Sequence, residues 1–199
     1  MNILANHSLK TFNTFGMDVK AKFLIDTGTI EDLRNVLREK RFSGLPLLIL
    51  GGGSNILFTD NFNGLVLRPD IKGIDVVRED ADFFYIKAGG GENWHRLVLF
   101  CVKKNYGGIE NLSLIPGNVG AAPIQNIGAY GVELKDVFVE LEAIHAKTSD
   151  IKLFTNNDCR FGYRNSIFKN EMKDQFIITS VTLRLPKKPV FNISYGAIE

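Results

Sequence analysis

Glycine is concentrated in the middle of this chain, and that concentration limits how the chain can fold. Of the 19 glycines, 14 lie between residues 51 and 131. Glycine destabilises helices and strands because it loses more conformational freedom on folding than any other residue. We therefore expect this part of the chain to turn sharply, or to approach something closely through bare backbone.

The first of two glycine motifs is the GGGSN loop (residues 51–55), which directly follows the apolar run PLLIL. A strand that ends in a glycine loop can present several N–H groups to phosphate oxygens. The loop lacks the Gly-Lys-Ser/Thr of a P-loop, and its sixth position is Ile56 rather than the glycine of a dinucleotide fingerprint. A glycine turn that binds nothing is the alternative, since such turns are common.

The second motif is the long glycine segment (residues 116–131), with the sequence PGNVGAAPIQNIGAYG. Its small residues would let a flat aromatic ring lie against the main chain. Gln125 and Asn126 offer amide groups that could read the edge of a heterocycle, and Ile124 and Ile127 add apolar contact. A close-packed structural turn is the alternative. Together the two motifs predict a cleft for a bulky, anionic ligand.

Hydrophobic patterning predicts an α+β chain. A helix that Thr29 caps should follow an early strand, and a helix that Asn93 caps should place Trp94 and Cys101 on its buried face. The apolar run at 46–50 is typical of a buried parallel strand. The other expected strands span residues 23–25, 56–58, 65–67, 74–77, 83–86, 137–143 and 176–185.

Composition excludes several classes of function. The net charge is +2 and the basic residues are scattered, which argues against nucleic acid or a membrane surface as partner. No apolar run approaches a membrane span, and the N-terminus lacks the pattern of a signal peptide, so we expect a cytoplasmic protein. Cys101 and Cys159 are expected to be buried thiols. The three histidines (His7, His95 and His145) show no metal-ligand spacing, so no metal is predicted.

The sequence RFGYR at residues 160–164 places an arginine after an aromatic residue. An arginine fork can hold a carboxylate or a phosphate through two parallel hydrogen bonds. A surface cation is the alternative, since charged side chains mostly stay exposed.

With these motifs the chain resembles the UDP-N-acetylenolpyruvoylglucosamine reductase family. The resemblance covers nearly the whole chain, and the matching stretches follow the family's order. They are NTFG (13–16), LGGGSN (50–55), GGGENW (89–94), IPGNVGAAPIQNIGAYG (115–131), CRFGYRNSIF (159–168) and YG (195–196).

The resemblance implies an α+β, two-subdomain FAD-binding fold of the vanillyl-alcohol-oxidase type. Residues 1–72 and 73–186 would form the two subdomains, and residues 187–199 a linker and the start of a substrate domain that is mostly absent. FAD would lie between the subdomains. The residues implied to bind it are Gly51, Gly53, Ser54, Asn55, Pro116, Gly117, Gly120, Ala121, Ala122, Gln125, Gly128, Gly131 and, near the adenine, Ile178.

The resemblance also implies an activity. NADPH would reduce the flavin and leave, and the reduced flavin would pass a hydride to the vinyl carbon of the enolpyruvyl UDP-sugar that takes its place. Arg164 matches the arginine that holds the substrate carboxylate and stabilises the enolate. Tyr195 matches a tyrosine near the substrate.

The family's third domain supplies a serine that donates the proton and a glutamate that stabilises the intermediate. This chain ends at Glu199, so we expect a truncated or split reductase, whose partner would be a separate C-terminal substrate domain. Two alternatives stay open. One is a non-catalytic FAD-binding module, and the other is a different flavin oxidase of the same class.

Overall fold

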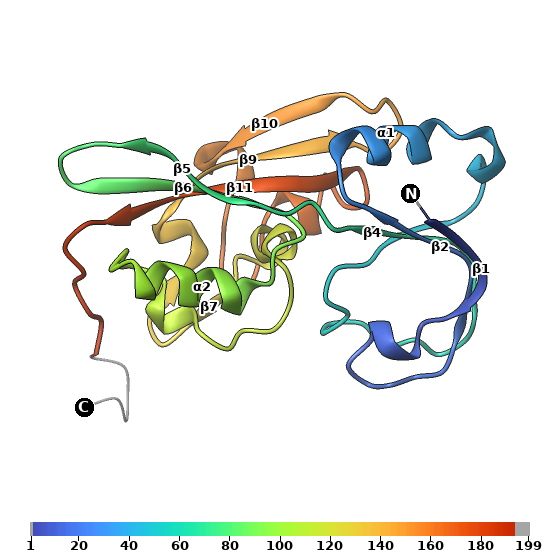
Figure 1. Ribbon diagram of the computed structural model, residues 1–199, viewed down its shortest axis with the longest axis horizontal. Helices are drawn as coiled ribbons and strands as arrows, with labels where there is room; N and C mark the ends of the chain where they lie inside the picture. Colours follow the sequence, from blue (N-terminus) through green and yellow to red (C-terminus); the bar gives the residue numbers. More distant parts are fainter. Residues whose placement is uncertain (1, 194–199) are drawn as a thin grey trace.

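Two β-sheets lie side by side in the computed structural model, which describes residues 2–193 (Figure 1). The first sheet has the strand order β1-β2-β4-β3, and the second has the order β10-β9-β11-β6-β5. The first sheet is built from β1 (Asn2–Ser8), β2 (Lys20–Thr27), β3 (Leu47–Ile49) and β4 (Phe62–Pro69). The second is built from β5 (Ile74–Glu79), β6 (Phe83–Gly89), β9 (Phe138–His145), β10 (Ile151–Thr155) and β11 (Phe176–Pro186).

The first sheet is mainly parallel. Strands β2 and β3 both run parallel to β4, whereas β1 pairs antiparallel with β2. The connection from β2 to β3 contains helix α1 (Ile30–Arg38). Thr29 caps this helix, because its hydroxyl accepts a hydrogen bond from the Asp32 N–H at 3.0 Å. The parallel strands bring the GGGSN loop, which follows β3, to one end of this sheet.

The second sheet is antiparallel, and its longest strand, β11, lies between β9 and β6. Helix α2 (Trp94–Lys103) follows β6, and Asn93 caps it by accepting from the Arg96 N–H at 3.0 Å. The predicted apolar face of this helix is confirmed, since Trp94 and Cys101 are both fully buried. Figure 1 shows α2 covering one side of this sheet.

Short elements complete the chain. They are the α-helix α3 (Asn156–Cys159), the strands β7 (Gly128–Ala129) and β8 (Val132–Glu133), and the 3-10 helices η1 (Lys10–Phe12), η2 (Lys40–Phe42), η3 (Glu110–Leu112), η4 (Val119–Gln125), η5 (Leu134–Asp136) and η6 (Ile167–Lys169). Helix η4 occupies the middle of the long glycine segment and packs against β11 and η6.

The two sheets share an apolar boundary. Ile144 of β9 and Ile177 of β11 are buried in the same cluster as Leu33 and Val36 of α1. Near this boundary the Arg34 side chain donates a hydrogen bond to the Ser149 carbonyl at 3.4 Å. The shared cluster fixes one sheet against the other, which matters because the cleft described below takes its walls from both. The subdomain limits placed at residues 72–73 and 186–187 stay a prediction.

Two expectations about strands are wrong. Residues 56–58 form no strand. The run at 46–50 contains β3, as predicted, but Leu47 and Ile49 are each 37% exposed rather than buried. The reason is that β3 is an edge strand, which among residues 2–193 pairs with β4 alone, and that its residues line a cavity. Strand β1 was not expected, because its sequence NILANHS is half polar.

The remaining predictions of helices and strands are confirmed within a few residues, and so is the burial of Cys101 and Cys159 as free thiols. Within residues 2–193 no helix has the length and apolarity that crossing a membrane requires. The same residues contain no cluster of three or more potential metal ligands.

A cleft between the two glycine motifs

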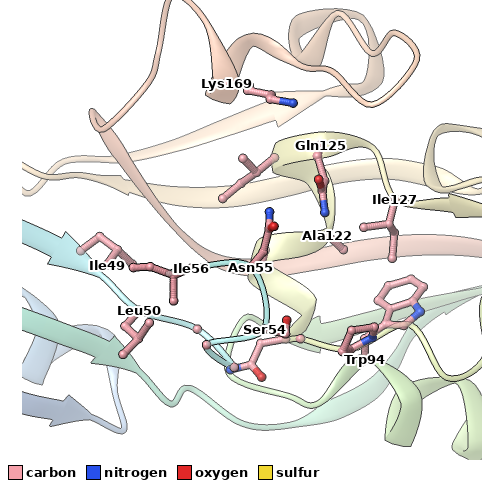
Figure 2. A pocket seen from close by; sticks show the side chains of 18 of the residues that line it. Ile49, Leu50, Ser54, Asn55, Ile56, Trp94, Ala122, Gln125, Ile127 and Lys169 are labelled. Atoms are coloured by element: carbon pink, nitrogen blue, oxygen red, sulfur yellow. The ribbon is translucent and has the colours of Figure 1, made fainter. Parts of the chain in front are cut away.

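Two adjoining cavities, of about 350 and 670 Å³, lie between the GGGSN loop and the long glycine segment. Figure 2 shows the first of them. They share much of their lining, so they are neighbouring parts of one cleft. The residues common to both are Leu48, Ile49, Gly51, Asn55, Asn118, Ala121, Ile124 and Lys169. The cleft therefore takes its walls from the end of β3, from η4 and from η6.

The GGGSN loop lines this cleft and has unused backbone donors. Leu50 makes the last sheet bond, donating its N–H to the Leu67 carbonyl at 2.9 Å. Within residues 2–193, no hydrogen bond is donated by the backbone N–H of any residue from 51 to 55. All five of these residues line the first cavity. Because backbone N–H groups are strong donors that folded proteins seldom leave unpaired, this loop is suited to an anionic ligand.

The three glycines of the loop are required for different reasons. Gly53 has a φ of +67°, and a Cβ there would lie 2.0 Å from the Phe12 carbonyl oxygen, so it is needed by the fold. A Cβ on Gly52 would lie 3.0 Å from the Cα of Gly117, where the two motifs touch. A Cβ on Gly51 would meet nothing closer than 3.9 Å, beside Ala121. The fold leaves that space open, so close approach of a ligand is what a glycine at 51 permits.

The long glycine segment supplies the opposite wall. Pro116, Gly117, Ala121, Ala122 and Gln125 line the first cavity. Most of these side chains are small, so the wall has little bulk on the side of the cleft.

Gly120 and Ile178 line the second cavity together. The Gly120 N–H donates to the Gly90 carbonyl at 2.9 Å, and a Cβ on Gly120 would lie 3.0 Å from the Ile178 carbonyl oxygen. This glycine therefore lets η4 pack directly on β11. The sequence motif alone could not distinguish that role from ligand contact.

Gly128 and Gly131 line neither cavity. Gly128 belongs to β7, which pairs with β8, and Gly131 has a φ of +76° in the turn that joins these two strands. The hairpin of β7 and β8 holds the Arg164 side chain, because the Gly128 carbonyl accepts a hydrogen bond from Nη2 of Arg164 at 3.1 Å. Arg164 itself also lies outside the lining of both cavities.

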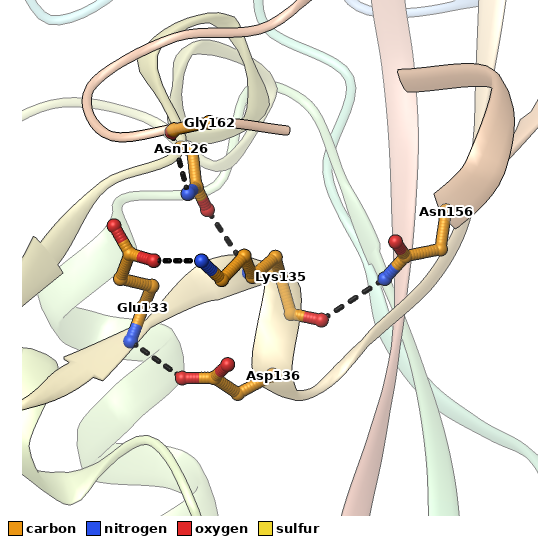
Figure 3. Close-up of polar contacts among 6 residues, drawn as sticks. All are labelled: Asn126, Glu133, Lys135, Asp136, Asn156 and Gly162. Carbon is orange, nitrogen blue, oxygen red and sulfur yellow. Dashed lines mark hydrogen bonds and ion pairs between the residues drawn. The ribbon is translucent and has the colours of Figure 1, made fainter. Parts of the chain in front are cut away.

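A buried asparagine joins the long glycine segment to the loop that carries Arg164 (Figure 3). Asn126 is fully buried, with a left-handed φ of +43°. Its Nδ2 donates to the Gly162 carbonyl at 3.0 Å, and its Oδ1 accepts from the Lys135 N–H at 3.0 Å. Ser166 adds a second tie, since its hydroxyl donates to the Ile124 carbonyl at 2.8 Å. The Arg164 loop is thus attached to the wall of the cleft.

The β8–η5 turn beside Asn126 is held by charged groups. Lys135 forms an ion pair with Glu133, whose hydrogen bond and negative charge raise the pKa of the Lys135 ammonium. The Glu133 N–H donates to the Asp136 carboxylate at 2.8 Å, and the Asn156 side chain donates to the Lys135 carbonyl at 2.9 Å (Figure 3). These charges are already paired, so this turn supports the site rather than offering a free charge to a ligand.

The structure also adds lining residues that the sequence did not single out. Asn118 and Lys169 line both cavities, and Met172 and Lys173 line the second. Nothing in the local sequence around Lys169 separates it from other surface lysines, and only the packing of η6 beside η4 places it there. Tyr195, which the resemblance assigned to the substrate, lies outside the described residues.

The fold and the cleft define a flavin-dinucleotide-binding protein, and the chain belongs to the FAD binding domain family, which matches residues 21–152. The predicted α+β fold of the vanillyl-alcohol-oxidase type is confirmed. The p-cresol methylhydroxylase structure is similar over 96% of this chain and 41% of the methylhydroxylase chain, with a TM-score of 0.64 at 15% identity.

Sequence relatives confirm the resemblance to UDP-N-acetylenolpyruvoylglucosamine reductases. Those of Flavobacterium johnsoniae and Amoebophilus asiaticus are 51% and 50% identical over all 199 residues. The chain spans 58% and 59% of their lengths. The reductase structure from Thermus caldophilus is similar over 94% of this chain and 63% of the Thermus chain, with a TM-score of 0.73 at 26% identity.

Proposed function

We propose that this chain is the FAD-holding portion of a UDP-N-acetylenolpyruvoylglucosamine reductase, which reduces an enolpyruvyl UDP-sugar at the expense of NADPH. The observation that carries the proposal is the set of undonated N–H groups at residues 51–55, in a loop that lines the cleft together with a wall of small residues. A reductase of this kind works on peptidoglycan precursors, and we place it in the cytoplasm.

The residues present suit the parts of FAD. The N–H groups of the GGGSN loop would hold the diphosphate, and the open space beside Gly51 would let it approach the backbone. The small residues of η4, with Gln125, would face the ribityl chain and the isoalloxazine ring. Ile178, in the second cavity, would lie beside the adenosine half. Bound FAD would supply the hydride-transfer chemistry that amino-acid side chains lack.

Arg164 would hold the substrate carboxylate next to the cofactor. Two observations support this role. The guanidinium donates to Gly128, three residues beyond the cleft-lining Gln125, and Asn126 and Ser166 attach its loop to the same wall. A permanently charged fork fixed beside the cleft can stabilise negative charge that develops on an enolate without reorganising during the reaction. Tyr195 as a second substrate contact stays a proposal from the resemblance.

FAD affinity tests the binding half of this proposal. We expect purified protein to bind FAD with quenching of flavin fluorescence. Gly51→Ala should weaken FAD binding about tenfold or more, equivalent to about 1.4 kcal/mol, because the methyl group fills the space beside the loop amides. Gly28→Ala is the matched control, since a Cβ on Gly28 meets no atom within 4 Å and Gly28 does not line the cleft. Equal FAD affinity for the two variants would contradict the assignment of the loop.

Enzyme turnover tests the proposed reductase activity. The assay is NADPH oxidation that depends on the enolpyruvyl UDP-sugar, measured for the chain alone and for the chain fused to the remaining length of the Flavobacterium johnsoniae relative. Arg164→Met should keep FAD and lower the rate of the active form about 100-fold, the usual cost of removing a group that stabilises an oxyanion. FAD binding without substrate-dependent turnover in either form would instead favour a non-catalytic flavin-binding module.

A further inference from the structure

The first cavity contains a single ionisable side chain. Among its lining residues, all within the described part of the chain, only Lys169 carries a charge. The second cavity adds Lys173 and Asp174, whose charges offset each other. Lys169 lines both cavities, and Figure 2 shows it across the cleft from Ser54 and Asn55. One cation therefore stands opposite the row of free amides, at the junction of the two cavities.

The backbone of Lys169 is held firmly although its side chain is exposed. Lys169 ends η6, in which Ile167 and Phe168 are buried. Ser166 caps this helix by accepting from the Phe168 N–H at 3.2 Å, and it also donates to the Ile124 carbonyl of η4, which lines the cleft beside η6. The base of the lysine side chain is thus positioned by the same packing that builds the cleft.

The ammonium group of Lys169 is not neutralised within the described residues. Its Nζ donates to the Arg164 carbonyl at 3.1 Å, and no carboxylate of residues 2–193 lies within 4.0 Å of it. By contrast, Arg160 pairs with Glu171 at 3.2 Å, and Lys135 pairs with Glu133. An ammonium group has three donors, so the Arg164 carbonyl leaves two for a ligand.

We propose that Lys169 supplies the counter-charge for the diphosphate of the bound dinucleotide, acting across the cleft from the amides of residues 51–55. This inference rests on the proposed FAD-holding function. A diphosphate carries two formal charges, and neutral amides satisfy its oxygens without cancelling its charge. A lysine opposite the loop adds a charge-assisted hydrogen bond, which is stronger than a neutral one. The same ammonium group keeps its bond to Arg164, so the residue that contacts the diphosphate also steadies the loop that carries Arg164.

Comparing flavins with and without the diphosphate tests this role. Fluorescence quenching would give the affinities of the protein for FAD and for riboflavin, and ADP would be tested as a competitor. Lys169→Met should weaken FAD and ADP about tenfold at low salt, since a hydrogen bond to a charged group is commonly worth that factor. Riboflavin affinity should not change, Lys169→Arg should restore most of the FAD affinity, and the loss should shrink as salt rises. Lys147→Met, an exposed lysine away from the cleft, is the control.

The outcomes separate the two proposals. If the unaltered protein binds no FAD, the FAD-holding function fails and this inference fails with it. If it binds FAD and Lys169→Met binds FAD equally well, only the role of Lys169 is overturned. Equal losses for FAD and riboflavin would also overturn it, because they would show a general effect on the cleft. Circular dichroism and thermal unfolding of each variant would identify any loss of folded protein.

Discussion

The two glycine motifs look alike in sequence and behave differently in the structure. The GGGSN loop donates no backbone hydrogen bond within the described chain. The long glycine segment is tied down through Gly120, Asn126 and Gly128. One motif leaves its backbone N–H groups undonated, and the other uses its polar groups to hold the wall of the cleft and the loop that carries Arg164. Glycine content therefore marks where a backbone is unusual, while hydrogen bonding shows whether the reason is a ligand or the fold.

The same contrast occurs inside the GGGSN loop itself. Gly53 is fixed by a left-handed φ and by Phe12, whereas Gly51 has free space where its side chain would be. Two residues apart, one glycine serves folding and the other is available to a cofactor. The following predictions test this division.

The largest expected effect is on folding. Gly53→Ala should lower the free energy of unfolding by about 4 kcal/mol or more, because the added methyl overlaps the Phe12 carbonyl and alanine disfavours a φ of +67°. Urea denaturation followed by circular dichroism measures this change. The free energy of unfolding of Gly51→Ala should stay within about 0.5 kcal/mol of that of the unaltered protein. If both substitutions were tolerated equally, the distinction between the two glycines would be lost.

Removing the buried tie of the long glycine segment should have the next largest effect. Asn126→Ala leaves the Lys135 N–H without its partner and removes the bond to the Gly162 carbonyl, which keeps its bond from the Asn165 N–H. We therefore expect a loss of about 2 kcal/mol in unfolding free energy. Limited trypsin digestion should also cut faster after Arg160 or Arg164 as their loop loosens. Asn35→Ala, at an exposed position in α1, is the control and should change stability little. Unchanged digestion and stability would show that Asn126 does not hold the loop.

The smallest effect concerns the core beneath the long glycine segment. Cys101 and Cys159 pack in one apolar cluster with Val119, Ala122 and Ile127, and burial raises the pKa of each thiol to about 12. The pKa of an unfolded thiol is near 9.0. Above that pH the unfolded chain gains stability by ionising while the buried thiol stays neutral, so each thiol's contribution to the free energy of unfolding is complete below pH 9.0 and is lost as the pH rises toward 12.

Unfolding free energy should therefore fall by about 1 kcal/mol per thiol between pH 8 and pH 10. Urea denaturation at both pH values measures it, and Cys101→Ala should remove one thiol's share. At pH 8, a thiol reagent should label both cysteines only after unfolding. Rapid labelling of the native protein would show that the core beneath this segment is open to solvent.

Much of the fold could be predicted because it depends on local signals. The caps at Thr29 and Asn93 and the apolar alternation at residues 137–143, where β9 lies, act through neighbours in sequence, and each gave the expected element. The exposure of β3 could not be predicted, because the same run of apolar residues is expected for a strand that faces a core and for one that faces a cavity. The sequence also could not predict that Gly128 and Gly131 lie in a hairpin outside the lining of the cleft.

By itself, the sequence determined that this chain carries two glycine motifs suited to a bulky, anionic ligand, since glycine spacing and apolar flanks are local properties. Only the tertiary structure decided which glycines face open space, that Lys169 stands opposite the loop amides, and that Asn126 joins the cleft to Arg164. Those facts depend on contacts between residues far apart in the chain, and they exist only once β3, η4 and η6 are packed around the same cleft.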